Sequence, residues 1–497
     1  MKIAIGYPPL ESKKGVAQLS QNRQFQWTAS GPMAYFIYPV IPASAATLLA
    51  SKGYEVFWLD GIAEKWSYQK WIDEVRNAKP DLIVIETKTP VVKRHWKIIK
   101  DLKKLEIRNW KLEICLIGDH VTAMPEESML NCPVDFIITG GDYDFLLLNI
   151  VNHLSKGEKL EPGIWYRQTT SNQQLAPKVM NTGKFQLNHD LESLPMIDRD
   201  LTKWQLYAYK NSNFYRAPGA YTMFGRDCWW GKCSFCSWTT LFPGNCFRKI
   251  SVEKAIKEVE HLVNKYNVKE IMDDSGSFPD GEWMRDFCRQ MIKHGLSKKV
   301  RFSCNMRFNA DLTEKDYELM GEAGFRFILY GLESASQETL DKINKNSKIE
   351  FIEPVLKMAK KAGLKPHLTV MVGYPWETEK DMNNTLDLAE SLFAKGLADT
   401  MQATVVIPYP GTPLFKYCQK NNLLKTEDWD RYDMRETIMK TKISDEKLMS
   451  AVRLLYSRSI KTPRFLLNTL AQLNTIDGIK YVGFQGLKFL GKLREFK

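Results

Sequence analysis

Short apolar runs alternate with amphipathic stretches over the first 160 residues of the chain. The runs are six to eight residues long and cover positions 2–7, 54–60, 81–86, 112–119 and 134–141. Helical patterns, such as those at 43–53 and 91–105, separate them. Short buried strands that alternate with helices predict a parallel, doubly wound sheet over residues 1–160. Sheets of this kind bind ligands at the carboxyl ends of their strands, and glycine and polar residues follow several of these runs.

A second series of strand-like runs follows a polar connector at residues 161–215. Six runs, at 220–227, 269–274, 300–307, 326–334, 367–375 and 401–410, each precede a helical pattern. Six βα units predict a partial (β/α)6 barrel of the TIM type over residues 216–430, with its active site at the carboxyl ends of the strands. Residues 431–497 become helical and basic, which predicts a helical C-terminal extension. The predicted fold class is therefore α/β.

Composition narrows the class of protein. With 44% hydrophobic and 26% charged residues the chain is an ordinary globular protein. It has no apolar stretch long enough to cross a bilayer, and its start lacks the features of a signal peptide, so we expect a cytoplasmic protein. The net charge is +12, of which residues 453–497 carry +7. The rest is close to neutral, so we expect no nucleic-acid partner.

Three cysteines stand close together after the first strand of the second series. Cys228, Cys233 and Cys236 lie in the run GRDCWWGKCSFCSW. Thiolates bind soft metals, and three of them leave one iron of a 4Fe–4S cluster without a protein ligand. Nine cysteines with three clustered also fit a reducing compartment. Two other interpretations stay open from the spacing alone, namely a zinc site completed by Cys246 and buried core thiols.

Further motifs follow at the ends of the predicted strands in a fixed order. After CSFC come EIMDDSGSF, CNMRF, GLESASQETLDKINK, MVGYPWET and VIPYPGTPLF. Together they resemble the radical S-adenosylmethionine (SAM) superfamily, specifically its members with an N-terminal, Rossmann-like cobalamin-binding domain. One departure is the spacing C-x4-C-x2-C in place of the family's usual C-x3-C-x2-C. An extra residue in a flexible loop is geometrically tolerable, but it leaves the loop conformation around Trp229 and Trp230 open.

The resemblance implies three cofactors, of which two meet at the cysteine run. The three cysteines would hold a 4Fe–4S cluster whose open iron chelates SAM, and the reduced cluster would cleave SAM to a 5′-deoxyadenosyl radical. Candidate SAM contacts at the strand ends are Asp273, Ser303, Asn305, Arg307, Glu333, Ser334, Gly373 and Pro375. Arg307 either contacts SAM or forms a salt bridge with a barrel carboxylate such as Glu333. Asp273 either binds SAM or substrate or caps the next helix, and Gly373 and Pro375 shape the backbone.

The third implied cofactor is cobalamin, bound by the N-terminal domain. Many cobalamin domains place a histidine on cobalt through a D-x-H-x-x-G motif, but no histidine here has an aspartate two positions earlier. Radical SAM members generally lack that motif, which implies cobalamin without a histidine below the cobalt. Candidate contacts are Tyr7, Pro8, Pro9, Glu86, Thr87, Thr89, Gly118, His120, Gly140 and Gly141. The sequence GGDYD departs from the G-E-G-E-like end frequent in the family, so a domain that no longer binds the corrin stays an alternative.

The C-terminal segment combines an apolar helical stripe with basic residues. The stripe consists of Tyr481, Phe484, Leu487, Leu490 and Leu493, and Lys488 and Lys492 lie off it. Such a helix either lies on an anionic membrane surface or docks on the barrel. The segment resembles the tails of family members that modify porphyrins or polycyclic lipids, which implies a hydrophobic, lipid or tetrapyrrole-like substrate, with a natural product as the other possibility.

Three functions follow from these features. The leading hypothesis is a cobalamin-dependent radical SAM methyltransferase that acts on an unactivated carbon. The second is a radical SAM enzyme that performs an oxidative cyclisation or rearrangement without methyl transfer. The third is a non-catalytic sensor that binds cobalamin or the cluster. Either enzyme would take electrons from a flavodoxin or ferredoxin reductase system and would be sensitive to oxygen.

Overall fold

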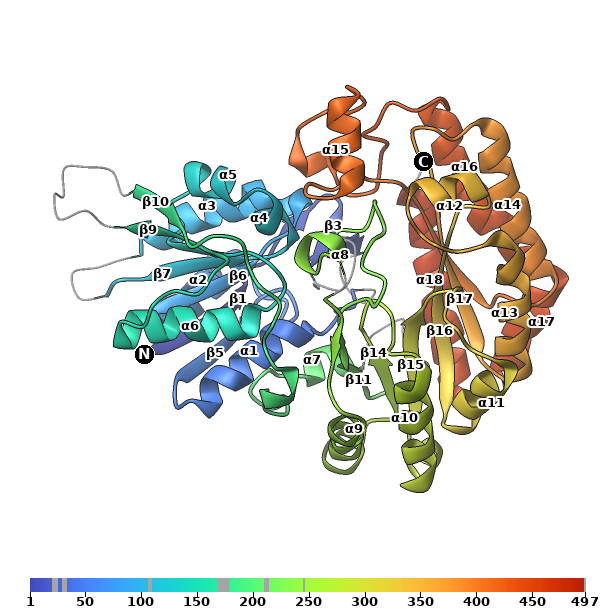
Figure 1. Ribbon diagram of the computed structural model, residues 1–497, viewed down its shortest axis with the longest axis horizontal. Helices are drawn as coiled ribbons and strands as arrows, with labels where there is room; N and C mark the ends of the chain where they lie inside the picture. The colour runs from blue at the N-terminus through green and yellow to red at the C-terminus, as the bar shows by residue number, and fades with distance from the viewer. Residues whose placement is uncertain are drawn as a thin grey trace.

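The computed structural model describes residues 1–19, 26–28, 34–105, 110–168, 178–209, 214–244 and 246–495. Within them the chain forms two α/β units that lie side by side, followed by C-terminal helices (Figure 1). The α/β class and the two-unit architecture predicted from the sequence are confirmed.

The N-terminal unit is built on a seven-stranded sheet in the order β10-β9-β8-β7-β6-β1-β5. Its strands are β1 (Lys2–Tyr7), β5 (Glu55–Asp60), β6 (Leu82–Glu86), β7 (Glu113–Ile117), β8 (Phe136–Ile138), β9 (Ile164–Gln168) and β10 (Lys178–Asn181). The first five are parallel and follow the order 2-1-3-4-5 of doubly wound sheets, in which the topological switch point, and hence the ligand crevice, lies between the first and third strands. Here these strands are β1 and β6.

Helices cover this sheet, and a small sheet lies near the carboxyl ends of β1 and β5. The helices are α1 (Val40–Ser51), α2 (Tyr68–Ala78), α3 (Val92–Lys103), α4 (Asp119–Ala123), α5 (Pro125–Asn131) and α6 (Tyr143–Lys156). The small antiparallel sheet contains β2 (Glu11–Ser12), β3 (Gly15–Gln18) and β4 (Gln26–Thr28). Every residue of β6 is buried because helices lie on both faces of the sheet, and this explains its unbroken apolar sequence.

The segment expected to be a polar connector, residues 161–215, is partly a piece of the first sheet. Its strands β9 and β10 extend the sheet antiparallel beyond β8. A short helix, α7 (Gln205–Ala208), follows in the same segment. These strands are short, mix apolar with polar residues (IWYRQ and KVMN) and are mostly half-buried, so they lack the continuous apolar pattern of the parallel strands.

The second unit is a six-stranded, wholly parallel sheet in the order β11-β14-β15-β16-β17-β18. The strands are β11 (Gly219–Thr222), β14 (Glu270–Asp273), β15 (Arg301–Met306), β16 (Phe325–Glu333), β17 (Lys365–Val372) and β18 (Thr400–Val405). Each falls within or overlaps one of the six predicted runs, so the partial (β/α)6 barrel is confirmed. A two-stranded ribbon of β12 (Gly225–Arg226) and β13 (Arg248–Lys249) flanks the cysteine run.

Local sequence signals start and orient the barrel helices. These are α8 (Trp238–Leu241), α9 (Val252–Tyr266), α10 (Gly281–Lys293), α11 (Glu314–Glu322), α12 (Gln337–Lys342), α13 (Ile349–Lys361), α14 (Glu379–Ala394) and α15 (Pro413–Lys420). Helices α11 and α14 begin with capping boxes, in which Thr313 or Thr378 pairs reciprocally with an aspartate three residues later. Helix α10 buries Met284, Phe287 and Met291 on one face, and the Phe287 ring lies 5.2 Å from that of Phe302 on β15.

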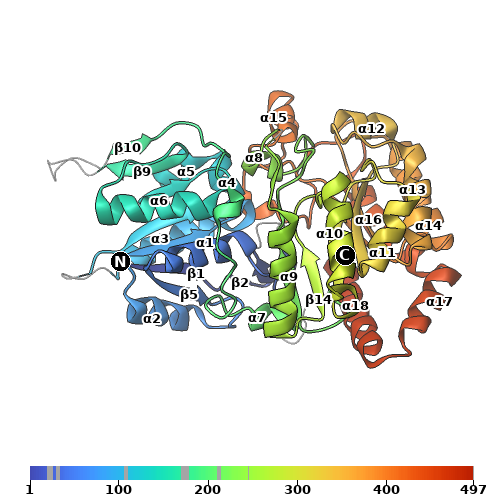
Figure 2. The same ribbon diagram turned by 60° about the horizontal axis from the view of Figure 1, so that its bottom comes forward.

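The C-terminal helices are α16 (Asp445–Ile460), α17 (Pro463–Gln472) and α18 (Ile476–Glu495). Helix α16 packs on β18 and α14, and Tyr456 donates a hydrogen bond to the Ala403 carbonyl, 3.1 Å away. Figure 2 shows α17 at the end of the molecule opposite β9 and β10. No helix in the described ranges is long and apolar enough to cross a bilayer.

Helix α18 places part of its predicted apolar stripe against protein. The Tyr481 ring lies 5.4 Å from that of Tyr215, and the Phe484 ring lies 6.2 Å from that of Tyr35. Leu487 is exposed, and the side chains of Leu490 and Leu493 lie outside the described residues. At Tyr481 and Phe484 the helix is therefore docked on the protein.

Candidate active site

The cysteine run lies at the carboxyl end of the barrel sheet, between β12 and α8. Cys233 is buried, Cys228 and Cys236 are half-buried, and all three are free thiols. Burial raises the pKa of Cys236, and the nearby thiols of Cys233 and Cys228 raise it further. The three thiols are therefore near enough to influence one another electrostatically.

Backbone hydrogen bonds anchor the loop that carries these cysteines. The Ser234 amide donates to the Ile343 carbonyl, and the Leu414 amide donates to the Ser234 carbonyl, each at 2.8 Å. The ring of Phe235, the aromatic residue before the third cysteine, meets that of Tyr374 edge-on at 6.4 Å. The loop is thus held by the segments that follow β16, β17 and β18, so the motifs predicted at these strand ends lie close to one another.

A single zinc ion finds no preformed site in the described part of the chain. No three His, Cys, Asp or Glu side chains there converge closely enough to bind one metal ion. Zinc needs four ligand atoms within about 2.0–2.3 Å of one centre. Cys246 is half-buried just before β13. The arrangement therefore gives the zinc alternative no support, whereas a cluster, which binds each thiolate to a different iron, would hold the sulfurs farther apart.

Two cations lie beside Cys233. Arg307 donates through Nη1 to the Cys233 sulfur at 3.5 Å, and its guanidinium lies 5.3 Å from the ring centroids of both Trp229 and Trp230. The predicted alternative of a salt bridge between Arg307 and Glu333 is wrong. Lys345 instead pairs with Glu333 at 2.6 Å, and both side chains are buried.

Other predicted SAM contacts are engaged within the protein. The Asp273 carboxylate accepts hydrogen bonds from the Thr222 hydroxyl at 3.0 Å and from the Phe224 amide at 2.9 Å, so it ties β14 to β11 and its neighbouring loop. The Ser303 hydroxyl lies 3.4 Å from the carboxylate of Glu270, the first residue of β14, and so points toward the amino end of the barrel. These two residues have structural partners, and their contact with SAM stays a prediction.

The remaining candidates lie nearer the mouth of the barrel. Ser334 donates to Glu377 at 2.7 Å, and burial raises the pKa of Glu377 to about 6. Gly373 has a φ of 97°, a left-handed conformation that favours glycine, and Pro375 follows it in the turn after β17. Gly373 therefore shapes the backbone of this turn, and its place beside SAM stays a prediction.

Several buried polar atoms around the cysteine run have no hydrogen-bond partner in the described structure. They are the Trp229 Nε1, the Ser234 hydroxyl, the Asn305 Oδ1 and the Tyr374 hydroxyl. Buried polar groups are normally paired, and an unpaired one points to a missing ligand or water. Three adjacent thiols and a set of unpaired donors and acceptors fit a thiolate-bound cluster with a polar cofactor beside it.

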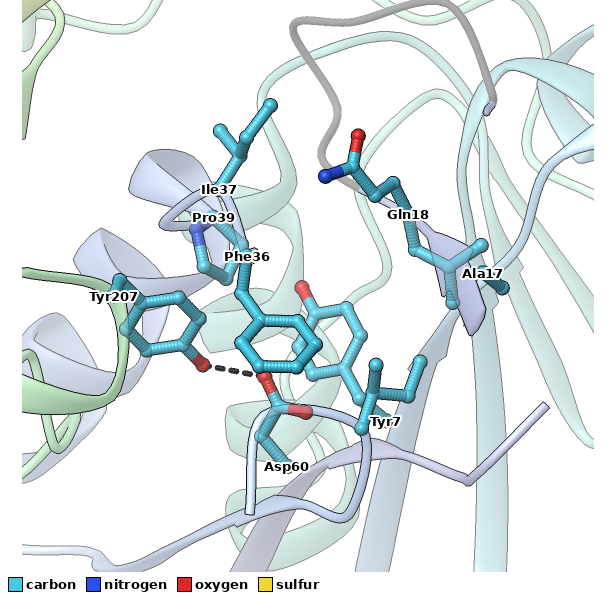
Figure 3. Close-up of a pocket in the computed structure, with 10 residues that line it drawn as sticks. Tyr7, Ala17, Gln18, Phe36, Ile37, Pro39, Asp60 and Tyr207 are labelled. Atoms are coloured by element: carbon cyan, nitrogen blue, oxygen red, sulfur yellow. Dashed lines mark hydrogen bonds between the residues drawn. The ribbon is translucent and has the colours of Figure 1, made fainter. Parts of the chain in front are cut away.

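The switch point of the N-terminal sheet contains the predicted cobalamin contacts. Tyr7, at the end of β1, donates to Glu86, at the end of β6, at 2.8 Å. Burial raises the pKa of Glu86 to about 7, and its Oε1 has no partner in the described structure. A pocket beside Tyr7 is lined in part by Gln18, Phe36 and Asp60 (Figure 3). The switch point therefore offers both a cavity and an unpaired carboxylate oxygen to a ligand.

Figure 3 also shows how the floor of this pocket is joined to the connector. Tyr207 of α7 donates a hydrogen bond to Asp60, and burial raises the pKa of Asp60 to about 6. No sequence pattern singles out Tyr207, because it is one of several tyrosines in a connector without a recognisable motif.

The other predicted cobalamin contacts surround the same edge. Thr87 pairs with His95 at 2.7 Å, and Thr89 lies 3.2 Å from the Nδ1 of His120. The Nε2 of His120 lies 3.1 Å from Glu127, so protein partners occupy both ring nitrogens of His120. Pro8 is buried and Pro9 half-buried after β1. His120 is thus fixed within the domain and not poised to bind a metal.

Glycines at this edge allow close approaches of the chain. A side chain at Gly118 would place its Cβ 2.0 Å from the Thr87 carbonyl oxygen, and at Gly140 it would lie 2.5 Å from the Phe185 ring. At Gly141 it would lie 2.0 Å from the ring of Phe242, which follows α8. Helix α8 also packs against α4. The edge of the N-terminal sheet therefore directly faces the loop that carries the cysteines.

A buried charge network joins the two units at the same place. Asp142 and Asp144, from the sequence GGDYD, are almost fully buried and pair with Arg226 and Arg248 on the β12–β13 ribbon. The Arg248 Nη2 lies 2.7 Å from Asp142, and the Arg226 Nη1 lies 3.0 Å from Asp144. His189 adds a 2.9 Å contact to Asp142. The residues that depart from the family pattern thus bind the ribbon that leads into Cys228.

These observations define an α/β enzyme whose thiol-rich barrel mouth faces the ligand edge of a doubly wound domain. Residues 222–389, which contain the three clustered cysteines, match the model of the Radical SAM superfamily. It is 28% identical over 474 residues, 94% of each chain, to an uncharacterized methyltransferase of Pyrococcus horikoshii. It is also 25% identical to the anaerobic magnesium-protoporphyrin IX monomethyl ester cyclase of Cereibacter sphaeroides, over 79% of this chain and 62% of the cyclase.

A solved structure extends the similarity in fold to the whole chain. The radical SAM methyltransferase TsrM of Kitasatospora setae, determined with cobalamin and a 4Fe–4S cluster bound, has a TM-score of 0.67 at 13% identity, and the match covers 99% of each chain. The N-terminal unit and the barrel therefore occur in the same combination in both proteins.

Proposed function

We propose that this protein is a cobalamin-dependent radical SAM methyltransferase that transfers a methyl group to an unactivated carbon. The observation that supports this most is that the carboxyl end of the N-terminal sheet lies directly against the loop that carries the three cysteines. Helix α8, directly after the cysteine run, packs on α4 of the N-terminal unit, and the Phe242 ring lies against Gly141. A radical generated at the barrel mouth and a methyl carrier held by the doubly wound sheet would both be near one substrate.

Cys228, Cys233 and Cys236 are the residues that would hold the 4Fe–4S cluster. When bound and reduced, the cluster supplies the electron that cleaves SAM, and cobalamin carries the methyl group. Arg307 and Lys345 place two positive charges near Cys233 and would offset the negative charge of thiolates there. The rings of Trp229 and Trp230 cover the Arg307 guanidinium and help to exclude water from that side.

Cobalamin would bind at the carboxyl edge of β1 and β6. The Glu86 oxygen without a partner is a free acceptor at this edge. His120 already has a protein partner at each ring nitrogen, which supports binding without a histidine below the cobalt. The alternative of a domain that has lost its corrin predicts no bound cobalamin after reconstitution, so a binding measurement separates the two.

The proposed substrate is a hydrophobic small molecule, either lipid or tetrapyrrole-like. Its support is the similarity to the magnesium-protoporphyrin cyclase, which acts on a tetrapyrrole. A natural-product substrate is the other candidate. A flavodoxin or ferredoxin is the expected electron donor, since the cluster must be reduced by one electron.

Anaerobic reconstitution with iron, sulfide and cobalamin tests the proposal. We expect a protein that cleaves SAM to 5′-deoxyadenosine when reduced, even without substrate. Cys233→Ala should lose both the absorbance of the cluster and this cleavage. Cys246→Ala is the matched control, because it removes a half-buried thiol from the same region and should retain both. SAM cleavage by Cys233→Ala would overturn the cluster assignment.

With a substrate in hand, stoichiometry decides between methylation and the second candidate. Methylation requires two SAM per product and yields one S-adenosylhomocysteine and one 5′-deoxyadenosine. The second candidate is an oxidative cyclase, which the 25% identity to the Cereibacter cyclase favours. Product without a methyl group from SAM would assign the protein to that class. Tight cluster and cobalamin binding without any SAM cleavage would instead indicate a sensor.

A further inference from the structure

Helix α17 and the start of α18 expose a row of aliphatic side chains. Seven of the fourteen large apolar side chains that stand exposed in the described residues lie between positions 466 and 487. Six of them, which are between 40% and 72% exposed, form what we call the α17–α18 apolar face: Leu466, Leu467, Leu470, Leu473, Ile476 and Ile479. Single exposed apolar residues are common, but a contiguous group of this size marks an interaction surface.

The packing of α17 explains why these side chains face outward. The helix buries none of its residues fully. Its contacts with the barrel include Phe465, whose ring lies 6.0 Å from that of Phe393 on α14, and the stem of Arg464, which lies against Gly396. Leu466, Leu470 and Leu473 recur at helical spacing and form a stripe away from these contacts. The apolar face is therefore a consequence of how the helix docks.

Basic residues border the face. Lys461 and Arg464 lie at the start of α17, Lys480 follows Ile479, and all three are exposed. None of the three forms an ion pair within the described ranges. Asp477 is the one acid between positions 453 and 494, a segment in which Lys and Arg predominate. The face thus combines aliphatic side chains with uncompensated positive charge.

We propose that the α17–α18 apolar face docks on an anionic lipid bilayer surface. Its leucine and isoleucine side chains enter the boundary between headgroups and acyl chains, and Lys461, Arg464 and Lys480 lie at the level of the phosphates. A symmetric contact with a second copy of the chain would bring like charges together, whereas an anionic surface attracts them. The sequence left open whether the stripe of Tyr481 and Phe484 meets a membrane or docks on the protein, and these two side chains lie against protein.

Vesicle flotation with the full-length protein tests this proposal and does not depend on the proposed reaction. We expect binding to vesicles made of equal parts phosphatidylglycerol and phosphatidylcholine, and little binding to phosphatidylcholine alone. The paired substitution Leu467→Gln and Leu470→Gln should lower the partition coefficient at least about tenfold, because two aliphatic side chains no longer enter the boundary region. The matched control, Leu130→Gln with Phe351→Gln, removes two exposed apolar side chains elsewhere and should bind as the parent does.

A second variant tests how much the basic residues contribute to vesicle binding. Replacing Lys461, Arg464 and Lys480 with glutamine should lower binding to the anionic vesicles on the order of a hundredfold at low salt. The parent should likewise bind less at about 0.5 M than at about 0.1 M salt, because the Debye length shortens. Thermal melting checks that each variant is folded.

Two results would overturn the proposal. One is a parent protein that does not float with anionic vesicles, or a Leu467→Gln, Leu470→Gln variant that floats as well as the parent. The other is a stable dimer, measured by light scattering without lipid, that the same leucine substitutions dissociate, since this result would assign the face to a second copy.

Discussion

Arg226 offers the sharpest test of how the two units are held together. Its side chain is almost fully buried, as are the two carboxylates of the N-terminal unit that it contacts, Asp144 and Asp142. The Arg226 Nη1 lies 3.0 Å from Asp144 and 3.4 Å from Asp142. Arg248 also pairs with Asp142 at 2.7 Å, so Asp142 keeps a cationic partner when Arg226 is removed, whereas Asp144 keeps hydrogen bonds from the Ser44 hydroxyl and the Phe145 amide but no cation among the described residues.

Replacing Arg226 with methionine should lower the free energy of unfolding by about 3–5 kcal/mol, the cost typical of leaving one partner of a buried ion pair without its counterion. The reason is that Asp144 would stay buried in an environment that cannot solvate its charge. The double variant Arg226→Met with Asp144→Leu removes both charges. It should recover most of the loss, because an apolar pair of similar volume is often as stable as a buried ion pair.

Urea denaturation, followed by tryptophan fluorescence, measures these differences as shifts of the midpoint. Glu253→Gln is the matched control, since it breaks an ion pair with Lys257 in which both side chains are more than 60% exposed. That change should cost no more than about 1 kcal/mol. If Arg226→Met shifted the midpoint no more than Glu253→Gln, the network would not hold the units together. A double variant less stable than Arg226→Met would refute the explanation by an unpaired buried carboxylate.

Three further predictions concern the same region. Gly141→Ala should lower the free energy of unfolding by about 1–3 kcal/mol, because the new Cβ would lie 2.0 Å from the Phe242 ring. Adding Phe242→Leu to this variant should recover part of the lost stability, measured as the midpoint of urea denaturation. Burial alone lowers the pKa of His189, but its hydrogen bonds to two carboxylates outweigh this and raise the pKa. The stabilisation by protonated His189 should therefore be complete below about pH 6.5 and lost as the pH rises through the raised pKa of His189 in the folded protein. The His189→Gln variant should lack this part of the pH dependence of the urea midpoint. Arg307→Gln should make the reduction potential of the reconstituted cluster more negative by on the order of tens of millivolts, because a positive charge beside Cys233 is lost. An unchanged potential in a spectroelectrochemical titration would show that Arg307 does not tune the cluster.

Local patterns were sufficient to predict most of the fold. Parallel strands buried on both faces must be short and continuously apolar, so the runs at 81–86 and 326–334 could be recognised from the sequence alone. The turn after each strand then placed the cysteine run and the later motifs at one end of the barrel, because all six strands are parallel. The strands β9 and β10 escaped prediction because they are short, mix apolar with polar residues and are only partly buried, and because they pair antiparallel beyond β8, the last of the parallel strands.

The candidate site likewise has a part that could be predicted from the sequence and a part that could not. The order of strands and motifs along the chain was enough to predict which residues gather at the mouth of the barrel, among them Cys233 and Arg307. The partners of the charged residues depend on packing between distant segments: Lys345 rather than Arg307 pairs with Glu333, and Arg226 reaches Asp144 across 82 positions of the chain. Hydrophobic periodicity is a local property set by backbone geometry, so it can be recognised in the sequence. The pairing of buried charges instead depends on which charged side chains are brought together and shielded from water when the two units pack.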